Sequence, residues 1–497
     1  MEDHKVRKVV IAGGGTAGWI AAAMLAKSMG KCVEIQLIES DAIPTVGVGE
    51  STIPPVINLH RVLDISEKEF LARVNGTFKL GISFENWQDV GENYVHSFGW
   101  AGKGNWAAGF QHFWLAGQKR GVDTTKYGDY CPEHLAARAE KFAVLPKNGV
   151  NYAYHIDAGL YAKFLREISE KYGATRTEGK ITAVNLNSQT GDIESLGLES
   201  GEIIHGDLFI DCTGFRALLI GEALKTEYVD WNHWLPCDRA VAVQTETVGT
   251  PVPYTRAIAH ECGWRWRIPL QSRMGNGLVY SSQYMEDDVA IRTLTDSIEG
   301  KMLNEPRVIK FRTGYREKHW SKNCVALGLS SGFLEPLEST SIHLIQKGVS
   351  RLVQLFPVNG IKQTEIDEYN RQSAEEVENI RDFIILHYHV TDRTDSEFWR
   401  YCREMDVPVS LRHKIDLFSD SGRVFKKEMD LFGEESWVQV MLGQGIKPRA
   451  YHPVVDSMDD DALRDFLSGL RNATQKTVDR LPAHHEFIDY YCKSDVM

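Results

Sequence analysis

The chain has 497 residues, 43% of them hydrophobic and 25% charged, which is typical of a globular protein with a large core. The formal net charge of −12 predicts a soluble, acidic protein and argues against binding to nucleic acid or to a membrane surface through polybasic residues. Its eight cysteines form no CxxC pair and no zinc-like Cys/His cluster, so we expect buried, reduced thiols and no metal site. The scattered cysteines favour a cytoplasmic protein.

The most informative segment comes first in the chain. An apolar run, Val9 to Ala12, predicts a strand, and glycines in GxGxxG spacing follow it directly, at Gly13, Gly15 and Gly18. Residues 21–27 then predict a helix that stops at Gly30, and residues 33–38 predict a second strand that ends at Glu39. This order is typical of a dinucleotide site. Phosphates would meet the helix N-terminus, and Glu39 would meet a ribose hydroxyl.

A competing interpretation of residues 9–26 is a signal peptide or membrane anchor, because this stretch is uncharged and follows several basic residues. Three consecutive glycines argue against an apolar helix, since each costs about 1 kcal/mol relative to alanine. The second strand and its acidic end are also unexplained by an anchor. No other stretch approaches the ~18 apolar residues of a membrane span.

Further elements follow in chain order. The Gly/Pro-rich residues 41–55 predict a functional loop, and an apolar strand that ends in Asp211 predicts a second close approach of the backbone. Periodicity and turn signals predict helices over 160–172, 365–387 and 477–491 and a hairpin of strands 181–186 and 193–198. In the last helix, Pro482 is expected near the start or at a kink. We therefore expect an α/β body over residues 1–360 and a mainly helical region over 361–497 that covers the substrate side.

Two later segments narrow the class of protein. Residues 263–269 read GWRWRIP, and residues 328–342 read GLSSGFLEPLESTSI. Together with the GGGTAGW start and the VGVGESTIP loop, they resemble the flavin-dependent tryptophan-halogenase family, and matches run from residue 8 to about 400. The resemblance implies an FAD-binding, Rossmann-type body of the aromatic-hydroxylase kind with an interleaved substrate region. The cofactor residues it implies are Gly13, Gly15, Thr16, Ala17, Gly18, Glu39, Val48, Gly49, Asp211, Gly328 and Leu337.

The resemblance also implies a reaction. A separate flavin reductase would supply FADH2, which would use O2 to oxidise bromide or chloride to hypohalous acid. Lys79 would guide that oxidant to an electron-rich, indole-like aromatic substrate. The single dinucleotide fingerprint agrees with a borrowed reductant, because no second motif is left for a nicotinamide. Alternatives are a flavin-dependent aromatic monooxygenase and a non-catalytic flavin-binding protein, and neither of these needs Lys79 with Glu338.

Each candidate catalytic residue also has a plain structural interpretation. A lysine usually lies on the surface, but Lys79 is flanked by Phe78 and Leu80, which favours burial. A buried Lys79 could donate a hydrogen bond to hypohalous acid or form a haloamine. Glu335 and Glu338 could be acids at a helix start, with Ser339 or Thr340 as its cap.

The family position instead makes Glu338 the carboxylate that stabilises the cationic intermediate and takes its proton. Backbone groups of Thr340 and Ser341 would bind the halide, and Ser341 replaces a glycine of the best-known members. His96 and Phe98 match an aromatic clamp on the indole ring, although a lone histidine is often structural. Trp264 and Trp266 are expected inside under either interpretation.

The substrate side departs from the tryptophan-specific pattern. Such members grip the amino acid group with adjacent tyrosines and a glutamate, whereas residues 436–453 contain no tyrosine pair. We therefore expect indole to be preferred over tryptophan, and bromide over chloride. The sequence leaves the oligomeric state open, with a homodimer as one alternative.

Overall fold

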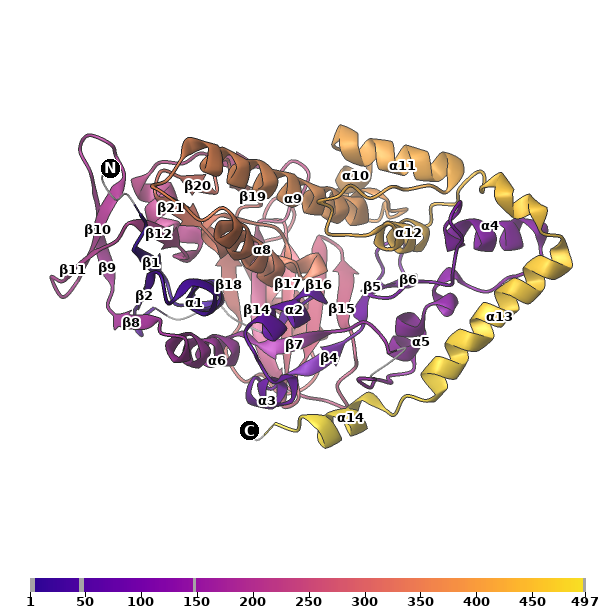
Figure 1. The fold of residues 1–497 in the computed structure, drawn as a ribbon. Helices are drawn as coiled ribbons and strands as arrows, with labels where there is room; N and C mark the ends of the chain where they lie inside the picture. The colour runs from indigo at the N-terminus through magenta and orange to yellow at the C-terminus, as the bar shows by residue number, and fades with distance from the viewer. Residues whose placement is uncertain (1–4, 44–48, 146–148, 495–497) are drawn as a thin grey trace.

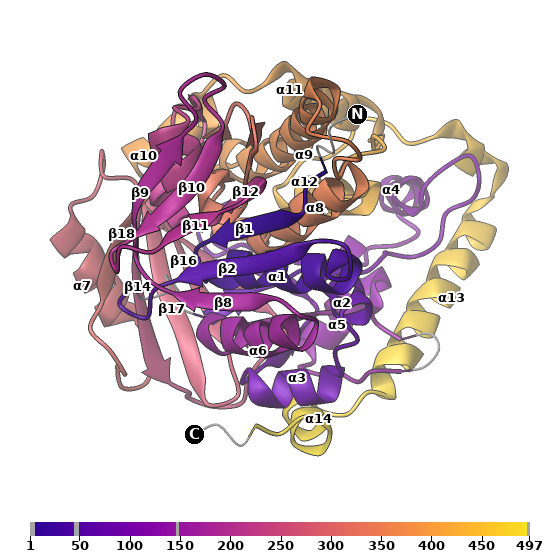
Figure 2. The same ribbon diagram turned by 60° about the vertical axis from the view of Figure 1, so that its left-hand side comes forward.

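A mainly parallel sheet carries the predicted nucleotide motif (Figures 1 and 2). In this computed structural model, which describes residues 5–43, 49–145 and 149–494, the strand order is β20 (Trp320–Ser321), β21 (Cys324–Ala326), β12 (Leu208–Asp211), β1 (Lys8–Ala12), β2 (Glu34–Glu39) and β8 (Thr175–Glu178). Ala12 pairs with Ile38 on one side and with Asp211 on the other. The carboxyl ends of β1, β2 and β12 therefore meet at one edge, where ligands bind in such sheets.

Helix α1 (Thr16–Met29) confirms the predicted strand–loop–helix order but starts before the predicted residue 21. Gly18 lets α1 pack closely against the end of β1, because it has no side chain. A Cβ at this position would lie 1.9 Å from the Gly13 carbonyl oxygen. Nearly every residue from Thr16 to Ala26 is buried, as α1 packs between the sheet, α6 (Ala158–Lys171) and α8 (Ser341–Gln354). The predicted helix over 160–172 corresponds to α6.

The second large sheet is mainly antiparallel. Its strand order is β18 (Arg307–Lys310), β14 (Arg239–Glu246), β17 (Arg273–Tyr280), β16 (Gly263–Pro269), β15 (Thr255–His260), β5 (Gly81–Glu85) and β6 (Asn93–Ser97). The GWRWRIP segment is β16, and every one of its residues is buried. Its alternation places Trp264 and Trp266 on one face.

A small sheet couples the two larger ones. Strand β7 (Ala153–Asp157) pairs with β3 (Gly49–Ser51) and with β4 (Thr77–Lys79). Gly49 lies opposite Asp157, and Lys79 lies opposite Ala153. Strand β7 thus lies between β3 and β4, and the Gly/Pro-rich segment reaches Lys79 through the Thr52 carbonyl, which accepts a hydrogen bond from Lys79 Nζ.

The predicted hairpin is confirmed as β9 (Ile181–Leu186) and β10 (Ile193–Leu198), which pair antiparallel and are extended by β11 (Ile203–His205). Short strands β13 (Tyr228–Asp230), β19 (Gly314–Arg316) and β22 (Gly332–Phe333) form another small sheet. Other helices surround these layers, namely α2 (Pro55–Val62), α3 (Glu67–Arg73), α4 (Phe110–Arg120), α5 (Pro132–Arg138) and α7 (Asp287–Ser297).

The region after residue 360 is helical, as expected. Its helices are α9 (Gln363–His389), α10 (Glu397–Glu404), α11 (Val409–Ser421), α12 (Glu434–Gly443), α13 (Asp460–Asp479) and α14 (His484–Tyr491). Helix α13 runs along α4 and α5 on the side of the molecule away from the parallel sheet (Figure 1).

One helix prediction is wrong in its bounds. Residues 477–491 do not form a continuous helix, because α13 ends at Asp479 and α14 begins at His484. Pro482 lies between the two helices, where its missing N–H and the restriction it places on Leu481 stop α13. The break lets α14 return to the body, where His484 Nε2 accepts a hydrogen bond from the Phe78 amide at 3.3 Å.

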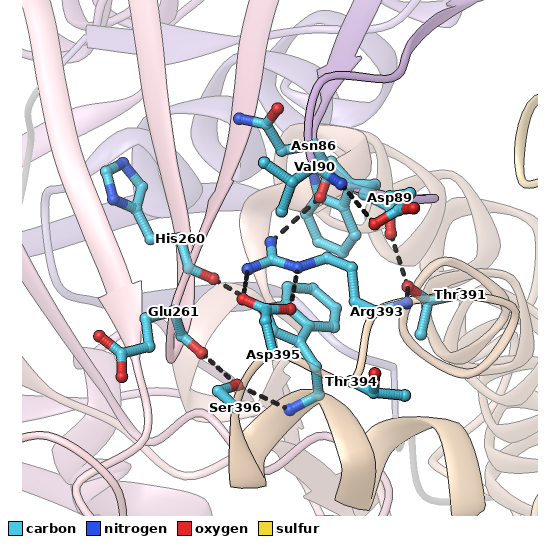
Figure 3. Close-up of polar contacts among 12 residues, drawn as sticks. Asn86, Asp89, Val90, His260, Glu261, Thr391, Arg393, Thr394, Asp395 and Ser396 are labelled. Carbon is cyan, nitrogen blue, oxygen red and sulfur yellow. Dashed lines mark hydrogen bonds and ion pairs between the residues drawn. The ribbon is translucent and has the colours of Figure 1, made fainter.

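The segment that follows α9 is fixed to the turns after β5 and after β15, at one end of the larger sheet (Figure 3). The Arg393 guanidinium donates to both carboxylate oxygens of Asp395 and to the Asn86 carbonyl, and it stacks 4.6 Å from the Trp399 ring centroid. Thr391 donates to the Trp87 carbonyl at 2.7 Å, and Ser396 donates to the Glu261 carbonyl at 2.7 Å. These contacts set the position of the last turns of α9.

All the cysteines are free thiols, and most are buried, although Cys32 is exposed. Over the described ranges, no helix has the length and apolar character needed to cross a bilayer. The same ranges contain no group of three or more His, Cys, Asp or Glu side chains placed to hold a metal ion.

Candidate active site

A cavity of about 600 Å³ opens at the carboxyl edge of the parallel sheet. Of the predicted cofactor residues, those on its wall are Gly13, Gly15, Thr16, Ala17, Glu39, Gly49 and Gly328. The cavity continues past Trp264, Trp266 and Ile268 to residues 339–341 at the start of α8. One end is thus the phosphate loop, and the other lies next to the FLEPLEST segment.

The phosphate loop has the geometry that a flavin dinucleotide needs. Gly13 has a φ of +105°, and a Cβ there would lie 2.3 Å from the Cys212 carbonyl oxygen. A Cβ on Gly14 would lie 1.6 Å from the Glu39 carboxylate. Only glycine fits at these two positions, and the N-terminus of α1 is left open to the cavity, so the residues present fit a bound pyrophosphate. Glu39 also accepts a hydrogen bond from Arg176 at 2.6 Å, which orients its carboxylate.

Other predicted cofactor residues lie outside the cavity wall. Gly18 packs α1 against β1, as described above. Leu337 is only 1% exposed and belongs to the hydrophobic core. The Asp211 carboxylate accepts hydrogen bonds from the Thr213, Leu219 and Ile220 amides, so it shapes the turn that contributes Cys212 to Arg216 to the wall. Val48 lies outside the described residues.

Both tryptophans of β16 line the cavity, and Trp264 also contacts a buried carboxyl group. Trp264 Nε1 donates to Glu335 Oε2 at 3.0 Å, and the Tyr388 hydroxyl donates to the same oxygen at 2.5 Å. Burial raises the pKa of Glu335 to about 7, against these two hydrogen bonds. Glu335 is therefore buried behind the cavity wall. The expectation that it is an acid at a helix start is confirmed for a short 3-10 helix, Pro336–Glu338, of which Glu335 is the N-cap residue, whereas α8 begins only at Ser341.

Lys79 is fully buried at the end of β4. Its Nζ donates to the Thr52 carbonyl at 3.1 Å and to Ser339 Oγ at 3.0 Å, and it lies 5.1 Å from the centroid of the Phe98 ring. Burial lowers the pKa of Lys79 to about 7, and the nearby charge of Glu338 opposes this shift. The burial expected from Phe78 and Leu80 is confirmed.

Glu338 lies between two imidazole rings. His96 Nδ1 is 2.9 Å from one carboxylate oxygen, and His387 Nε2 is 2.8 Å from the other. Burial alone would raise the pKa of Glu338, but the charges and hydrogen bonds of His96 and His387 lower it to about 2. His96 is thus a polar partner of the carboxylate as well as a ring in the aromatic cluster.

Ser339 connects the Lys79 cluster with the cofactor cavity. Its backbone has a φ of +59°, and its hydroxyl accepts from Lys79 while the residue also lines the cavity. Thr340 is the N-cap residue of α8, as expected for Ser339 or Thr340, but its side chain makes no cap hydrogen bond. Thr340 and Ser341 both face the cavity at this helix start.

An aromatic wall stands beside the His96 ring. Phe383 of α9 and Phe432 stack with centroids 3.9 Å apart, and the His96 ring lies 5.4 Å from Phe383 and 6.1 Å from Phe432. Trp437 of α12 meets Phe383 edge-on at 4.9 Å. Phe98 is half-buried next to Lys79, so aromatic side chains lie near both the lysine and the carboxylate.

His387 is one of the site residues that the sequence analysis missed. It belongs to the predicted helix over 365–387 but was not singled out, because it lies far from Glu338 along the chain. A signal was present, since His387 falls one helical turn after Phe383 and Ile384, on the buried face of α9. A polar side chain in such an apolar stripe needs a partner.

The comparisons with known proteins agree with this geometry. A family model described as tryptophan halogenase matches residues 8–460. The tryptophan 6-halogenase SttH of Streptomyces toxytricini is 35% identical over 98% of this chain and 98% of that protein. The structure of Xcc4156, a flavin-dependent halogenase from Xanthomonas campestris, has a TM-score of 0.97 and 56% identity, covering 99% of this chain and 100% of that one. BrvH, a flavin-dependent halogenase from Brevundimonas sp. BAL3, has a TM-score of 0.94 and 42% identity over 99% and 100%.

Proposed function

Since this chain belongs to the tryptophan halogenase family and is a flavin-dependent halogenase, we propose that it halogenates an electron-rich, indole-like aromatic with bromide or chloride and O2. A separate flavin reductase supplies the reduced cofactor. FAD bound in its reduced form supplies the chemistry that converts halide and O2 to hypohalous acid. The chain's own residues hold the cofactor, bind the halide, and receive and direct the oxidant.

The observation that carries this proposal is the position of Ser339. It belongs to the cavity wall and contacts Lys79 Nζ at 3.0 Å. An oxidant released at the start of α8 therefore meets the buried lysine as it leaves the cavity. The backbone of Thr340 and Ser341 lies at the same helix start, which favours a bound halide through partial positive charge.

Lys79 holds the oxidant in one of two ways. As an ammonium it donates a hydrogen bond to hypohalous acid and increases its electrophilicity, and as a neutral amine it forms a haloamine. Because the pKa of Lys79 is about 7, the pH dependence of the rate distinguishes these two routes. The ammonium route loses rate as the pH rises through 7, whereas the haloamine route gains rate over the same range.

Glu338 acts on the aromatic ring. When a ring carbon attacks the halogen, a cationic intermediate forms. An ionised carboxylate nearby lowers the energy of that cation and accepts its proton. The aromatic wall of Phe383, Phe432 and Trp437 offers stacking surface for such a ring. His96 and Phe98 complete the substrate-binding surface.

The wall provides poor partners for a charged amino acid group. Glu435, the acid nearest to Trp437 along α12, accepts hydrogen bonds from the Tyr127 hydroxyl and the Ala101 amide. Burial raises the pKa of Glu435 to about 7 despite these bonds. A substrate ammonium group would have to displace these bonds, so we propose a substrate without a zwitterionic tail.

The test is a reconstitution with FAD, a flavin reductase, NADH, indole and either bromide or chloride. The proposal requires products whose mass spectra carry the halogen isotope pattern. Omission of the reductase or the halide should remove that product. A hydroxylated product with no halogen would instead support an aromatic monooxygenase.

A further inference from the structure

We propose that His387 and Tyr94 are positioning residues for Glu338, which keep its carboxylate ionised and oriented toward the substrate. The inference deepens the proposed function and rests on it in one respect, namely that Glu338 is the group facing the cationic ring. Sequence analysis assigned no role to either residue.

The contacts form a chain of polar groups that runs from the half-buried Tyr94 to the buried Glu338. The Tyr94 hydroxyl lies 2.8 Å from His387 Nδ1, His387 Nε2 lies 2.8 Å from Glu338 Oε1, and His96 Nδ1 lies 2.9 Å from Glu338 Oε2. Glu338 is 1% exposed and the His387 ring is fully buried, so water does not compete for these contacts. Each carboxylate oxygen thus has an imidazole nitrogen next to it.

Glu338 and Tyr94 together favour the tautomer of His387 that carries its proton on Nε2, because an ionised carboxylate only accepts hydrogen bonds and the Tyr94 hydroxyl can donate to Nδ1. A tyrosine hydroxyl that donates to Nδ1 leaves the proton on Nε2, which is the nitrogen beside Glu338. The opposite tautomer would place a lone pair against the negative carboxylate. Phe84 holds both rings in place, since it stacks on Tyr94 at 4.9 Å and on His387 at 4.4 Å.

The backbone of His387 is also fixed. Gln444 Nε2 donates to the His387 carbonyl at 2.5 Å, and the anchored turn after α9 begins only a few residues later (Figure 3). Strand β6 carries Tyr94 and His96 on the other side, while Lys79 of β4 is the remaining charged group near the carboxylate. Among the described residues, the titratable groups that interact with Glu338 are thus His96, His387 and Lys79, with Tyr94 behind His387.

An ionised carboxylate is what the chemistry needs. Because it is already deprotonated, it stabilises the cationic ring as soon as the halogen bonds to carbon. The ring C–H bond then breaks, its electron pair restores the aromatic ring, and the proton goes to Glu338. A carboxyl held at a low pKa returns that proton at neutral pH, so the base is ready for the next turnover.

The experiment is a pH titration of Glu338 in the full-length protein, followed by infrared difference spectroscopy of the protonated carboxyl group. The Glu338→Gln variant identifies its band. In wild type the band should appear only under strongly acidic conditions. In His387→Phe it should appear about one to two pH units higher, the size expected from losing a contact to a charged group.

Further variants distinguish a positioning role of His387 from a general disturbance of the fold. His387→Gln keeps an N–H donor near the Nε2 position and should restore most of the wild-type titration. Tyr94→Phe should give a smaller upward shift, because His387 remains and only the Tyr94 contact to its Nδ1 is lost. His389→Phe, two residues along the same helix and hydrogen-bonded to the Cys402 carbonyl, is the matched control and should leave the band unchanged.

An unchanged titration in His387→Phe overturns the proposal. If that variant does not fold, an unchanged titration in Tyr94→Phe does the same. The measurement uses no flavin, halide or substrate, so it stands apart from a failure to detect halogenation. In the active enzyme, the acid limb of kcat should move upward with the band, while KM for the aromatic substrate changes little.

Discussion

At the scale of single residues, the site pairs a lysine that is easily deprotonated with a carboxyl that is hard to protonate. Burial lowers the pKa of Lys79 to about 7, and the flanking histidines lower that of Glu338 to about 2. Glu338 therefore stays negative throughout the working pH range, while Lys79 can exchange a proton near neutrality. Their environments push the pKa values of the two groups in the directions that their proposed roles require.

Replacement of Glu338 by glutamine should lower the turnover of halogenation by roughly 10² or more, the usual size for a lost general base. Hypohalous acid formation should continue, because Glu338 lies outside the cavity wall. Product formation and a chemical trap for the oxidant would be measured side by side. Equal turnover in the variant would show that the carboxylate has only a structural role.

The sequence predicted Lys79 and Glu338 through motif resemblance, but not their partners. A short motif identifies a residue, whereas a partner such as His387 is set by tertiary packing of a distant helix. His96 was predicted as an aromatic clamp, and only the structure places its Nδ1 on Glu338. A polar residue in a buried helical stripe was the available signal for His387.

At the scale of elements, the turn after α9 supports the site from outside. Arg393, only 3% exposed, ties this turn to the Asn86 carbonyl and to Asp395. We expect Arg393→Lys to lower the free energy of unfolding by about 1–2 kcal/mol, because lysine cannot keep the paired hydrogen bonds and the stacking on Trp399.

Chemical denaturation would measure this loss, with Arg400→Lys as the control. Arg400 lies on the adjacent helix and donates a single exposed hydrogen bond, to the Thr394 carbonyl. Equal stability of the two variants would show that Arg393 does not anchor this turn.

The aromatic wall near α12 leads to a prediction about substrate. Indole should have a higher kcat/KM than tryptophan under one halide, because an ammonium and a carboxylate lose several kcal/mol of hydration in a site without partners. Residues 436–453 carry their charged side chains, Lys447 and Arg449, on the exposed surface. A preference for tryptophan would mean that another group in the C-terminal region grips the amino acid.

Elements were predictable from sequence where local signals agreed with packing. The hairpin of β9 and β10 and the long helix α9 were found in place, because turn residues and apolar periodicity specify them locally. For residues 477–491 the sequence predicted that Pro482 lies near a helix start or at a kink, but not that two separate helices meet there, since tertiary contacts favour the return of α14 to the body.

At the scale of the whole molecule, one nucleotide motif serves one cavity. The motif lies at the meeting edge of β1, β2 and β12, and the described chain follows it with no second GxGxxG loop. FAD should therefore come off readily, and NADH alone should not reduce it. Absorbance of the bound flavin, followed with and without a reductase, checks both. Rapid bleaching by NADH without the reductase would contradict the account.

In the proposed mechanism, the oxidant made in the flavin cavity acts only after it reaches Lys79. The most direct test is halogenation of indole by Lys79→Ala, with FAD affinity and oxidant release measured on the same sample. We predict that FAD binding and hypohalous acid release persist while halogenated indole disappears, since Lys79 lies beyond Ser339 and away from the Gly13 loop. Substantial halogenated indole from a folded Lys79→Ala protein would contradict the mechanism.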